Sequence, residues 1–215
     1  MHFLQQARVL FVAVSEPGGG AGVQGDIKTV TCLGGYAATA ITALTAQNTR
    51  GVYGIHEVPA RFISRQISLV MEDIGADALK TGMLHNAAVI RAVAAGVAPY
   101  AGSIPLVVDP VMFAKGGAAL LEKKAIATLK EKLIPLAALL TPNIPEAEHL
   151  SGTRITTLDD MIIAAKAILA LGCKALLLKG GHLPGNTVTD ILVHHDMYEI
   201  FTDTRLDTPH THGTG

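Results

Sequence analysis

Residues 106–112 read LVVDPVM, a short apolar run that ends in an aspartate and a proline. Because neighbouring residues of a strand point to opposite faces of a sheet, apolar residues at consecutive positions predict a strand buried on both faces, as in a parallel sheet. Other runs have the same character, at residues 9–14, 37–44, 78–81, 138–141 and 175–179.

Longer stretches with helical spacing separate these runs. Apolar residues recur every three or four positions within 59–74 and again within 86–97. Thr157 and Asp160 have the spacing of a capping box, and the apolar segment after them ends at Gly172, a residue suited to the position just after a helix. These stretches predict helices that cover the sheet.

The last part of the chain has a different pattern. Residues 191–193 and 198–201 flank His195 and Asp196, which predicts a β-hairpin rather than another strand–helix unit. No internal repeat, charge block or long linker divides the chain. We therefore expect residues 1–215 to form a single α/β domain with three layers, in which helices cover both faces of a mostly parallel central sheet.

The composition excludes several classes of protein. Of the 215 residues 49% are hydrophobic, enough for a large core, and 17 Lys+Arg against 18 Asp+Glu form no basic run, so nucleic acid is not an expected partner. The apolar run at 9–14 is too short to span a membrane. Cys32 and Cys173 lie far apart and indicate neither a disulfide framework nor a cysteine zinc site, which favours a cytoplasmic protein.

A glycine-rich loop follows the first predicted strand. Residues 20–25 match the GxGxxG pattern of dinucleotide-binding proteins, but no acidic residue lies between Asp26 and Glu57, where the ribose would need one. The GxxxxGK pattern of a P-loop is absent as well. What remains is the carboxylate of Asp26, which either accepts a hydrogen bond from a small ligand or is solvated in the first turn of a helix.

Polar and small residues follow other predicted strands, at the edge where parallel sheets bind ligands. Gln47 and Asn48 carry amides that suit the edge of a heteroaromatic ring, although they could equally cap a loop. Met83 could pack on a flat ligand or fill the core. Taken one at a time, these positions are better explained by structure than by ligand binding.

The later strand ends carry charges suited to phosphoryl transfer. Asp109 suits a contact to Mg²⁺, although it could also cap a turn. Asn143 and Glu146 lie three residues apart, so both would face one ion-bound phosphate cluster if Pro145 begins a helix. Lys179 precedes two glycines, where phosphates can approach closely.

The segment Gly213-Thr214-Gly215 predicts a turn whose backbone N–H groups converge on an anion. Phosphoryl transfer needs a cation, carboxylate-held magnesium and N–H groups aimed at the developing charge. Lys179, then Asp109 with Glu146, and finally this turn would supply them. Together these residues favour a ligand site more strongly than any one of them alone.

In their order, these motifs resemble one family over nearly the whole chain. The resemblance rests on GGAG at 19–22 with Asp26, TALTAQNT at 42–49, KTGML at 80–84, DPVM at 109–112, TPN at 141–143 with PEA at 145–147, KGGH at 179–182 and HGTG at 212–215. The chain is similar to the hydroxymethylpyrimidine/phosphomethylpyrimidine kinases of thiamin biosynthesis, within the ribokinase-like superfamily.

The resemblance implies a cytoplasmic homodimer that uses ATP and Mg²⁺ to phosphorylate hydroxymethylpyrimidine and then its monophosphate. It implies that the pyrimidine is held by Asp26, Gln47, Met83 and Val111. It assigns to Mg-ATP the residues Asn143, Glu146, Lys179 and Thr214, beside the magnesium contact expected of Asp109.

The resemblance also implies that Gly213, Thr214 and Gly215 form the anion hole for the transferred phosphoryl group. In this family the catalytic residue, usually a cysteine, directly follows that turn. We therefore expect the chain to be truncated at the turn, with the rest of the C-terminal part and much of the adenine pocket missing.

Two segments depart from the family pattern. The first loop of the family usually reads Gly-Ser-Asp-Pro-Ser, whereas residues 14–18 read Val-Ser-Glu-Pro-Gly, which places a longer carboxylate at Glu16 beside the expected substrate pocket. Residues 113–117 lack the hydroxyl residue that often follows Lys115. The first departure leaves the substrate preference open, and the second leaves a lid or phosphate contact open.

Two other functions stay open at this point. A pyridoxal or pyridoxine kinase is the nearest alternative, because both kinds of substrate are flat heteroaromatic rings with a hydroxymethyl group. A noncatalytic pyrimidine-binding module is the other. His210 with His212 and the neighbours His194 and His195 invite a metal interpretation, but no third ligand has the spacing of a zinc site, so we do not expect zinc.

Overall fold

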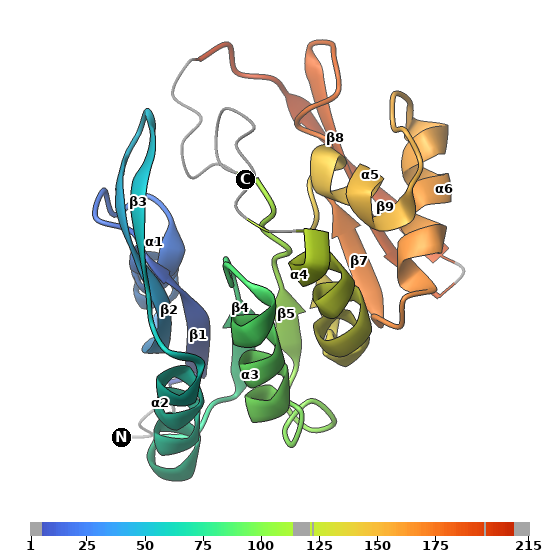
Figure 1. Cartoon of the computed structure of the whole chain (residues 1–215). Coiled ribbons are helices and arrows are strands. Elements are labelled where there is room, and N and C mark those ends of the chain that lie inside the picture. The colour runs from blue at the N-terminus through green and yellow to red at the C-terminus, as the bar shows by residue number, and fades with distance from the viewer. Residues whose placement is uncertain (1–5, 114–120, 122, 196, 209–215) are drawn as a thin grey trace, which may run out of the picture.

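The computed structural model describes residues 6–113, 121, 123–195 and 197–208 of the chain (Figure 1). Within those residues the centre is a nine-stranded sheet with the order β3-β2-β1-β4-β5-β6-β7-β8-β9. The strands are β1 (Arg8–Ser15), β2 (Tyr36–Asn48), β3 (Gly51–Glu57), β4 (Ala78–Thr81), β5 (Leu106–Val108), β6 (Leu139–Leu140), β7 (Ala175–Leu178), β8 (Thr187–His194) and β9 (Met197–Thr204). Pairing is parallel from β2 across to β7 and antiparallel at both ends of the sheet.

Helices lie on both faces of this sheet, as predicted. They are α1 (Gly22–Cys32), α2 (Ala60–Asp73), α3 (Ala87–Val97), α4 (Lys123–Thr128), α5 (Ile144–Ser151) and α6 (Leu158–Leu169), with a π-helical turn at Leu129–Leu133 and a 3₁₀ turn at Ile134–Leu136 after α4. Phe11 and Ala13 of β1 pack against Val23 of α1. The alternate residues Leu10 and Val12 point to the other face, where they join the cluster that includes α2, α3, α5 and α6.

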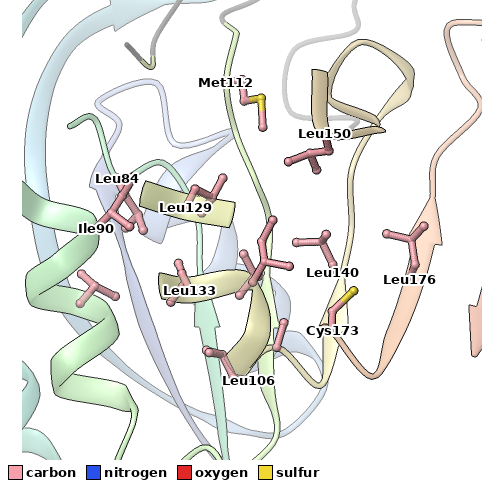
Figure 2. Packing of buried hydrophobic residues seen from close by; sticks show 14 of the residues in the cluster. Leu84, Ile90, Leu106, Met112, Leu129, Leu133, Leu140, Leu150, Cys173 and Leu176 are labelled. Atoms are coloured by element: carbon pink, nitrogen blue, oxygen red, sulfur yellow. The ribbon is translucent and has the colours of Figure 1, made fainter. Parts of the chain in front are cut away.

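The register of the parallel strands places buried side chains of the main core in rows across the sheet. Leu10 pairs with Leu79, and Leu79 pairs with Leu106, so these three fully buried side chains form one row across the sheet. A second row runs through Val108, Leu140 and Leu176, and Figure 2 shows its leucines in the same packed cluster as Leu133 and Leu150. Each buried leucine contributes roughly 1.5–3 kcal/mol relative to an exposed one.

The helix starts follow the capping residues expected from the sequence. Asn86 caps α3 by accepting a hydrogen bond from the backbone N–H of Val89 at 3.0 Å. Thr157 and Asp160 form a reciprocal capping box at the start of α6. This helix ends at Leu169 with Ala170 as its C-cap, so Gly172 lies one residue beyond the position expected for it.

The first hairpin is the main departure from the predicted elements. The strand expected at 37–44 continues to Asn48 and pairs with β3, which the sequence did not predict. Asn48 closes the turn because its side-chain oxygen accepts hydrogen bonds from the N–H groups of Arg50 and Gly51. Since β1 pairs with β2 only as far as Leu44, the rest of this hairpin projects past the neighbouring strands (Figure 1).

The late hairpin is confirmed and is longer than predicted. Strands β8 and β9 pair antiparallel along their whole length, and His195 lies in the turn with a positive φ of 51°. Together with the parallel centre and the two helical layers, this hairpin confirms the three-layer α/β fold.

The capping box of α6 generates a stability prediction. Replacing Thr157 by Ala removes the acceptor for the N–H of Asp160, and we expect a loss of about 1 kcal/mol in the free energy of unfolding, measured by urea denaturation. Thr157→Ser keeps the hydroxyl and is the matched control. Equal stability of the two variants would contradict the capping role.

Candidate functional site

Charged side chains from five places in the chain gather at the carboxyl edge of the parallel strands. In chain order they are Asp26 on α1, Lys80 on β4, Asp109 after β5, Glu146 on α5 and Lys179 after β7. The loop tips singled out in the sequence therefore converge on one edge.

Asp26 is paired and largely removed from water. The Lys80 Nζ atom lies 2.9 Å from each of its carboxylate oxygens, and the Asp26 side chain is 18% exposed. Burial raises the pKa of Asp26, Lys80 opposes that rise, and the nearby Asp109 adds to it. The alternative of an Asp26 solvated in the first helical turn is therefore wrong.

The glycine loop before α1 is shaped by one close approach of the backbone. Gly22 has a φ of 55°, and a Cβ at this position would lie 2.5 Å from the carbonyl oxygen of Val14. Only glycine fits such a position without strain. The start of α1, and with it the position of Asp26, depends on this contact.

Glu16 has a role that the sequence interpretation missed. Its buried carboxylate accepts hydrogen bonds from the backbone N–H groups of Gly18 at 2.8 Å, Gly20 at 3.1 Å and Ala21 at 3.3 Å. These are the loop donors that a dinucleotide pyrophosphate would require. In this structure they are directed at a carboxylate of the chain itself. A buried acid in front of consecutive glycines was the available signal.

Asp109 and Lys179 form a loose ion pair. The Lys179 Nζ lies 3.6 Å from Asp109 Oδ1, and the side chains are 22% and 21% exposed. The hydroxyl of Thr141 donates to the same Asp109 oxygen at 3.3 Å. Because the pair is long and partly solvated, its geometry leaves the ammonium group able to turn toward another anion.

Glu146 is held by backbone groups inside a capping box. Its Oε2 accepts from the N–H of Asn143 at 2.9 Å, while Asn143 Oδ1 accepts from the N–H of Glu146 at 3.0 Å. The N–H of Met112 donates to Oε1 at 3.3 Å. Helix α5 begins at Ile144, one residue before the predicted Pro145.

The environment of Glu146 disfavours its charge. The residue is 3% exposed, and its pKa is raised to about 7, chiefly by burial and in part by the charge of Asp109. The N–H of Asn143 and the charge of Lys179 act in the opposite direction. An additional cation at this edge would favour the ionised form.

Lys179 is positioned by backbone contacts on both sides. Its N–H donates to the carbonyl of Pro142 at 2.9 Å, and its backbone forms an isolated parallel bridge with Asn143. The next residue, Gly180, donates its N–H to Asp190 Oδ1 at 2.8 Å and lies so close to the carbonyl of Thr189 that a Cβ would collide with it. The glycine is thus required by the approach of β8.

Besides Asp26, three residues are expected to hold the pyrimidine: Met83, Val111 and Gln47. Met83 is 7% exposed and belongs to a small apolar cluster with Val14 and Ala43, against which Val111 packs. Gln47 is half-buried on β2, in the part of the hairpin that projects past β1. The structure therefore brings Met83 and Val111 together.

Lys80 was missed as a site residue. The available signal was a lysine inside the short strand predicted at 78–81, where a charge needs a partner.

Some of the residues singled out in the sequence, namely Gly213, Thr214, Gly215 and the His210–His212 pair, lie outside the described residues. Within the described part of the chain, no three His, Cys, Asp or Glu side chains gather as a metal site, and no helix is long and apolar enough to cross a membrane.

Comparisons with known proteins agree with this geometry. The family model described as "Phosphomethylpyrimidine kinase" matches residues 16–215. The chain is 48% identical to a hydroxymethylpyrimidine/phosphomethylpyrimidine kinase of Bacillus subtilis, over 97% of the chain and 77% of that protein. It is 51% identical to the "Thiamine biosynthesis bifunctional protein ThiED" of Geobacter sulfurreducens, over 96% of the chain but only 42% of that longer protein.

Solved structures show the same relationship. The crystal structure of a Clostridium difficile phosphomethylpyrimidine kinase has a TM-score of 0.85 at 42% identity, covering 91% of this chain and 84% of that one. An ADP complex of Bacillus subtilis pyridoxal kinase has a TM-score of 0.87 at 34% identity, covering 98% and 79%. The fold and the site define a ribokinase-like phosphotransferase. More narrowly, the chain belongs to the phosphomethylpyrimidine kinase family.

The buried Glu146 generates a pH prediction. The unfolded chain ionises this group near its ordinary pKa of 4.5, whereas the folded chain keeps the proton until about pH 7. The native state therefore binds more protons in this window, and we expect the Glu146 contribution to the free energy of unfolding to fall as pH rises through it.

Urea denaturation of the metal-free and nucleotide-free chain at a series of pH values measures this fall. Glu146→Gln cannot ionise and should flatten the difference between pH 4.5 and about 7. Glu199→Gln, at an exposed position of β9, is the matched control and should keep the wild-type slope. Parallel curves for wild type and Glu146→Gln would contradict the assignment.

Proposed function

We propose that the protein phosphorylates the hydroxymethyl group of hydroxymethylpyrimidine, and then the resulting monophosphate, with ATP as donor in thiamin biosynthesis. Family membership supports the reaction class. The observation that carries the proposal for the site is the convergence of Lys179, Asp109 and Glu146 at the same edge as Asp26.

The phosphoryl-transfer part of the site uses the charges around β5 and β7. Lys179 attracts the terminal phosphates, for which its loose contact with Asp109 leaves it available. Asp109 and Glu146 supply carboxylate oxygens, and this donor set fits Mg²⁺, which is commonly bound through one or two carboxylates together with substrate phosphates. Mg²⁺ bound there would neutralise charge on the transferred phosphoryl group.

Two further segments are proposed to contact the nucleotide: the loop before α5, through Asn143, and residues 213–215. Asn143 uses its side-chain oxygen to cap α5, which leaves its amide N–H donors for a phosphate. The resemblance to the family assigns a contact to ATP to Thr214, and the binding of the transferred phosphoryl group to Gly213, Thr214 and Gly215, all of which lie outside the described residues.

The pyrimidine part of the site combines apolar contact with directional hydrogen bonds. Met83 and Val111 form an apolar surface suited to one face of a flat ring. Asp26 accepts a hydrogen bond from the ring amine, and the amide of Gln47, on the projecting hairpin, forms a hydrogen bond with the edge of the ring. This arrangement directs the hydroxymethyl group toward the phosphates held at Lys179.

A pyridoxal kinase activity is the second candidate. The likeness to a pyridoxal kinase structure with bound ADP favours it. We also infer a cytoplasmic homodimer. Leu33 and Tyr36, just before and at the start of β2, expose apolar side chains that support this inference, and light scattering after size-exclusion chromatography would detect the dimer.

A direct assay separates the candidates. The full-length gene product is incubated with ATP and Mg²⁺ and either hydroxymethylpyrimidine or pyridoxal, and phosphorylated product is measured by mass spectrometry. We expect a kcat/KM for hydroxymethylpyrimidine about tenfold or more above that for pyridoxal. Binding by calorimetry without turnover would identify a noncatalytic pyrimidine-binding module, and consumption of neither compound would refute the kinase.

The cation at the β7 end provides a sharper test. Lys179→Met should lower kcat about 100-fold or more, because the charge on the transferred phosphoryl group loses its stabilising ammonium. Lys174→Met, at an exposed position just before β7, is the matched control and should keep wild-type kcat. An unchanged kcat in a folded Lys179→Met protein would remove Lys179 from the site.

A further inference from the structure

Lys80 occupies an unusual place for a charged residue. It lies in β4, which pairs with β1 on one side and β5 on the other, between the buried Leu79 and Thr81. A lysine in such a position is almost always paired. The strand register also fixes its direction, because Lys80 pairs with Phe11, which faces α1.

The partner of Lys80 is the carboxylate of Asp26 on that same helix. Both oxygens of the carboxylate lie 2.9 Å from Nζ, so the ammonium group straddles the carboxylate and fixes its plane. A carboxylate offers about four lone-pair directions, and this contact uses two of them. The others stay available for a ligand, consistent with the 18% exposure of the Asp26 side chain.

Fold stability alone does not account for this pair. A partly buried ion pair gains little over an apolar pair of similar volume, because each charge loses hydration. Asp26 is also close enough to Asp109 for the second carboxylate to favour its protonation. Without Lys80 at β4, Asp26 would face Asp109 alone across this edge, and a protonated carboxyl group would present a donor where an acceptor is needed.

We propose that Lys80 is a positioning residue that orients Asp26 as the hydrogen-bond acceptor for the ring amine of an aminopyrimidine, and that it thereby sets the preference for this substrate over pyridoxal. The proposal rests on the proposed function. A ring that presents an ionised oxygen at the same place forms a poorer contact with a fixed carboxylate, since that site favours a hydrogen-bond donor and repels negative charge.

Kinetics of Lys80→Met in the full-length gene product test the preference. We expect kcat/KM for hydroxymethylpyrimidine to fall about tenfold or more, mainly through KM, while kcat/KM for pyridoxal changes less. Lys80→Arg keeps the charge and should restore most of the preference. Lys166→Met, at an exposed position of α6, is the matched control and should behave as wild type.

A pH profile separates positioning from a purely structural role. The groups that face Asp26 are Lys80 from β4 and Asp109 from the loop after β5. Removing the lysine should move the acid limb of kcat/KM for hydroxymethylpyrimidine to higher pH in Lys80→Met, and Lys80→Arg should leave it in place. If Lys80→Met does not fold, Lys80→Gln carries the same expectations.

A measurement without substrate keeps this proposal distinct from the proposed function. The carboxyl carbon of Asp26, assigned by comparison with Asp26→Asn, is titrated by NMR in the free chain, and its midpoint should rise in Lys80→Met. Turnover of neither substrate by wild type would refute the kinase, and the titration would still report on the pair. An unchanged Asp26 titration, or an equal loss for both substrates, would overturn the role of Lys80.

Discussion

Parallel pairing in a fixed register is the constraint on which the core and the site both depend. Leu10, Leu79 and Leu106 lie in one row because β1, β4 and β5 pair without a shift. The same pairing makes these strands end at a common edge, where the chain must turn into loops or helices. Apolar rows along the strands and charged side chains at their ends are therefore two results of one arrangement.

Charge compensation governs that edge. The carboxylates of Asp26 and Asp109 each face a lysine, from β4 and from the end of β7. Glu146 is instead surrounded by backbone N–H groups and lies near Asp109, and its pKa of about 7 reflects an environment that would accept more positive charge. The edge is thus better prepared for a cation that arrives with phosphates than for an isolated anion.

Local signals were sufficient for much of the fold. The strand predicted at 78–81 matches β4 at its observed bounds, and the helical spacing from residue 86 and the capping box at Thr157 predicted two helix starts, because these signals act within one or two helical turns. The hairpin partner β3 was missed because residues 51–57 contain no strict apolar alternation and depend on pairing with the extended β2. Strand pairing of this kind is not a local property.

The site also combines residues that the local sequence predicted with residues whose roles depend on tertiary contacts. The sequence predicted that Asp26, Asp109, Glu146 and Lys179 would gather at one edge, because polar residues after buried strands collect there, and in the structure they do. Lys80 and Glu16 were not assigned roles, since their partners are set by how α1 and its loop fold back on the sheet.

The sequence by itself determined the alternation of strands and helices, their caps and the chemical types of the residues at strand ends, because these depend on neighbours along the chain. Only the tertiary structure decided which charges meet. Lys80 and Asp26 are 54 residues apart and become partners when α1 packs on the face of β1 to which the lysine of the neighbouring strand β4 also points. Such contacts depend on register and helix docking, which no short segment specifies.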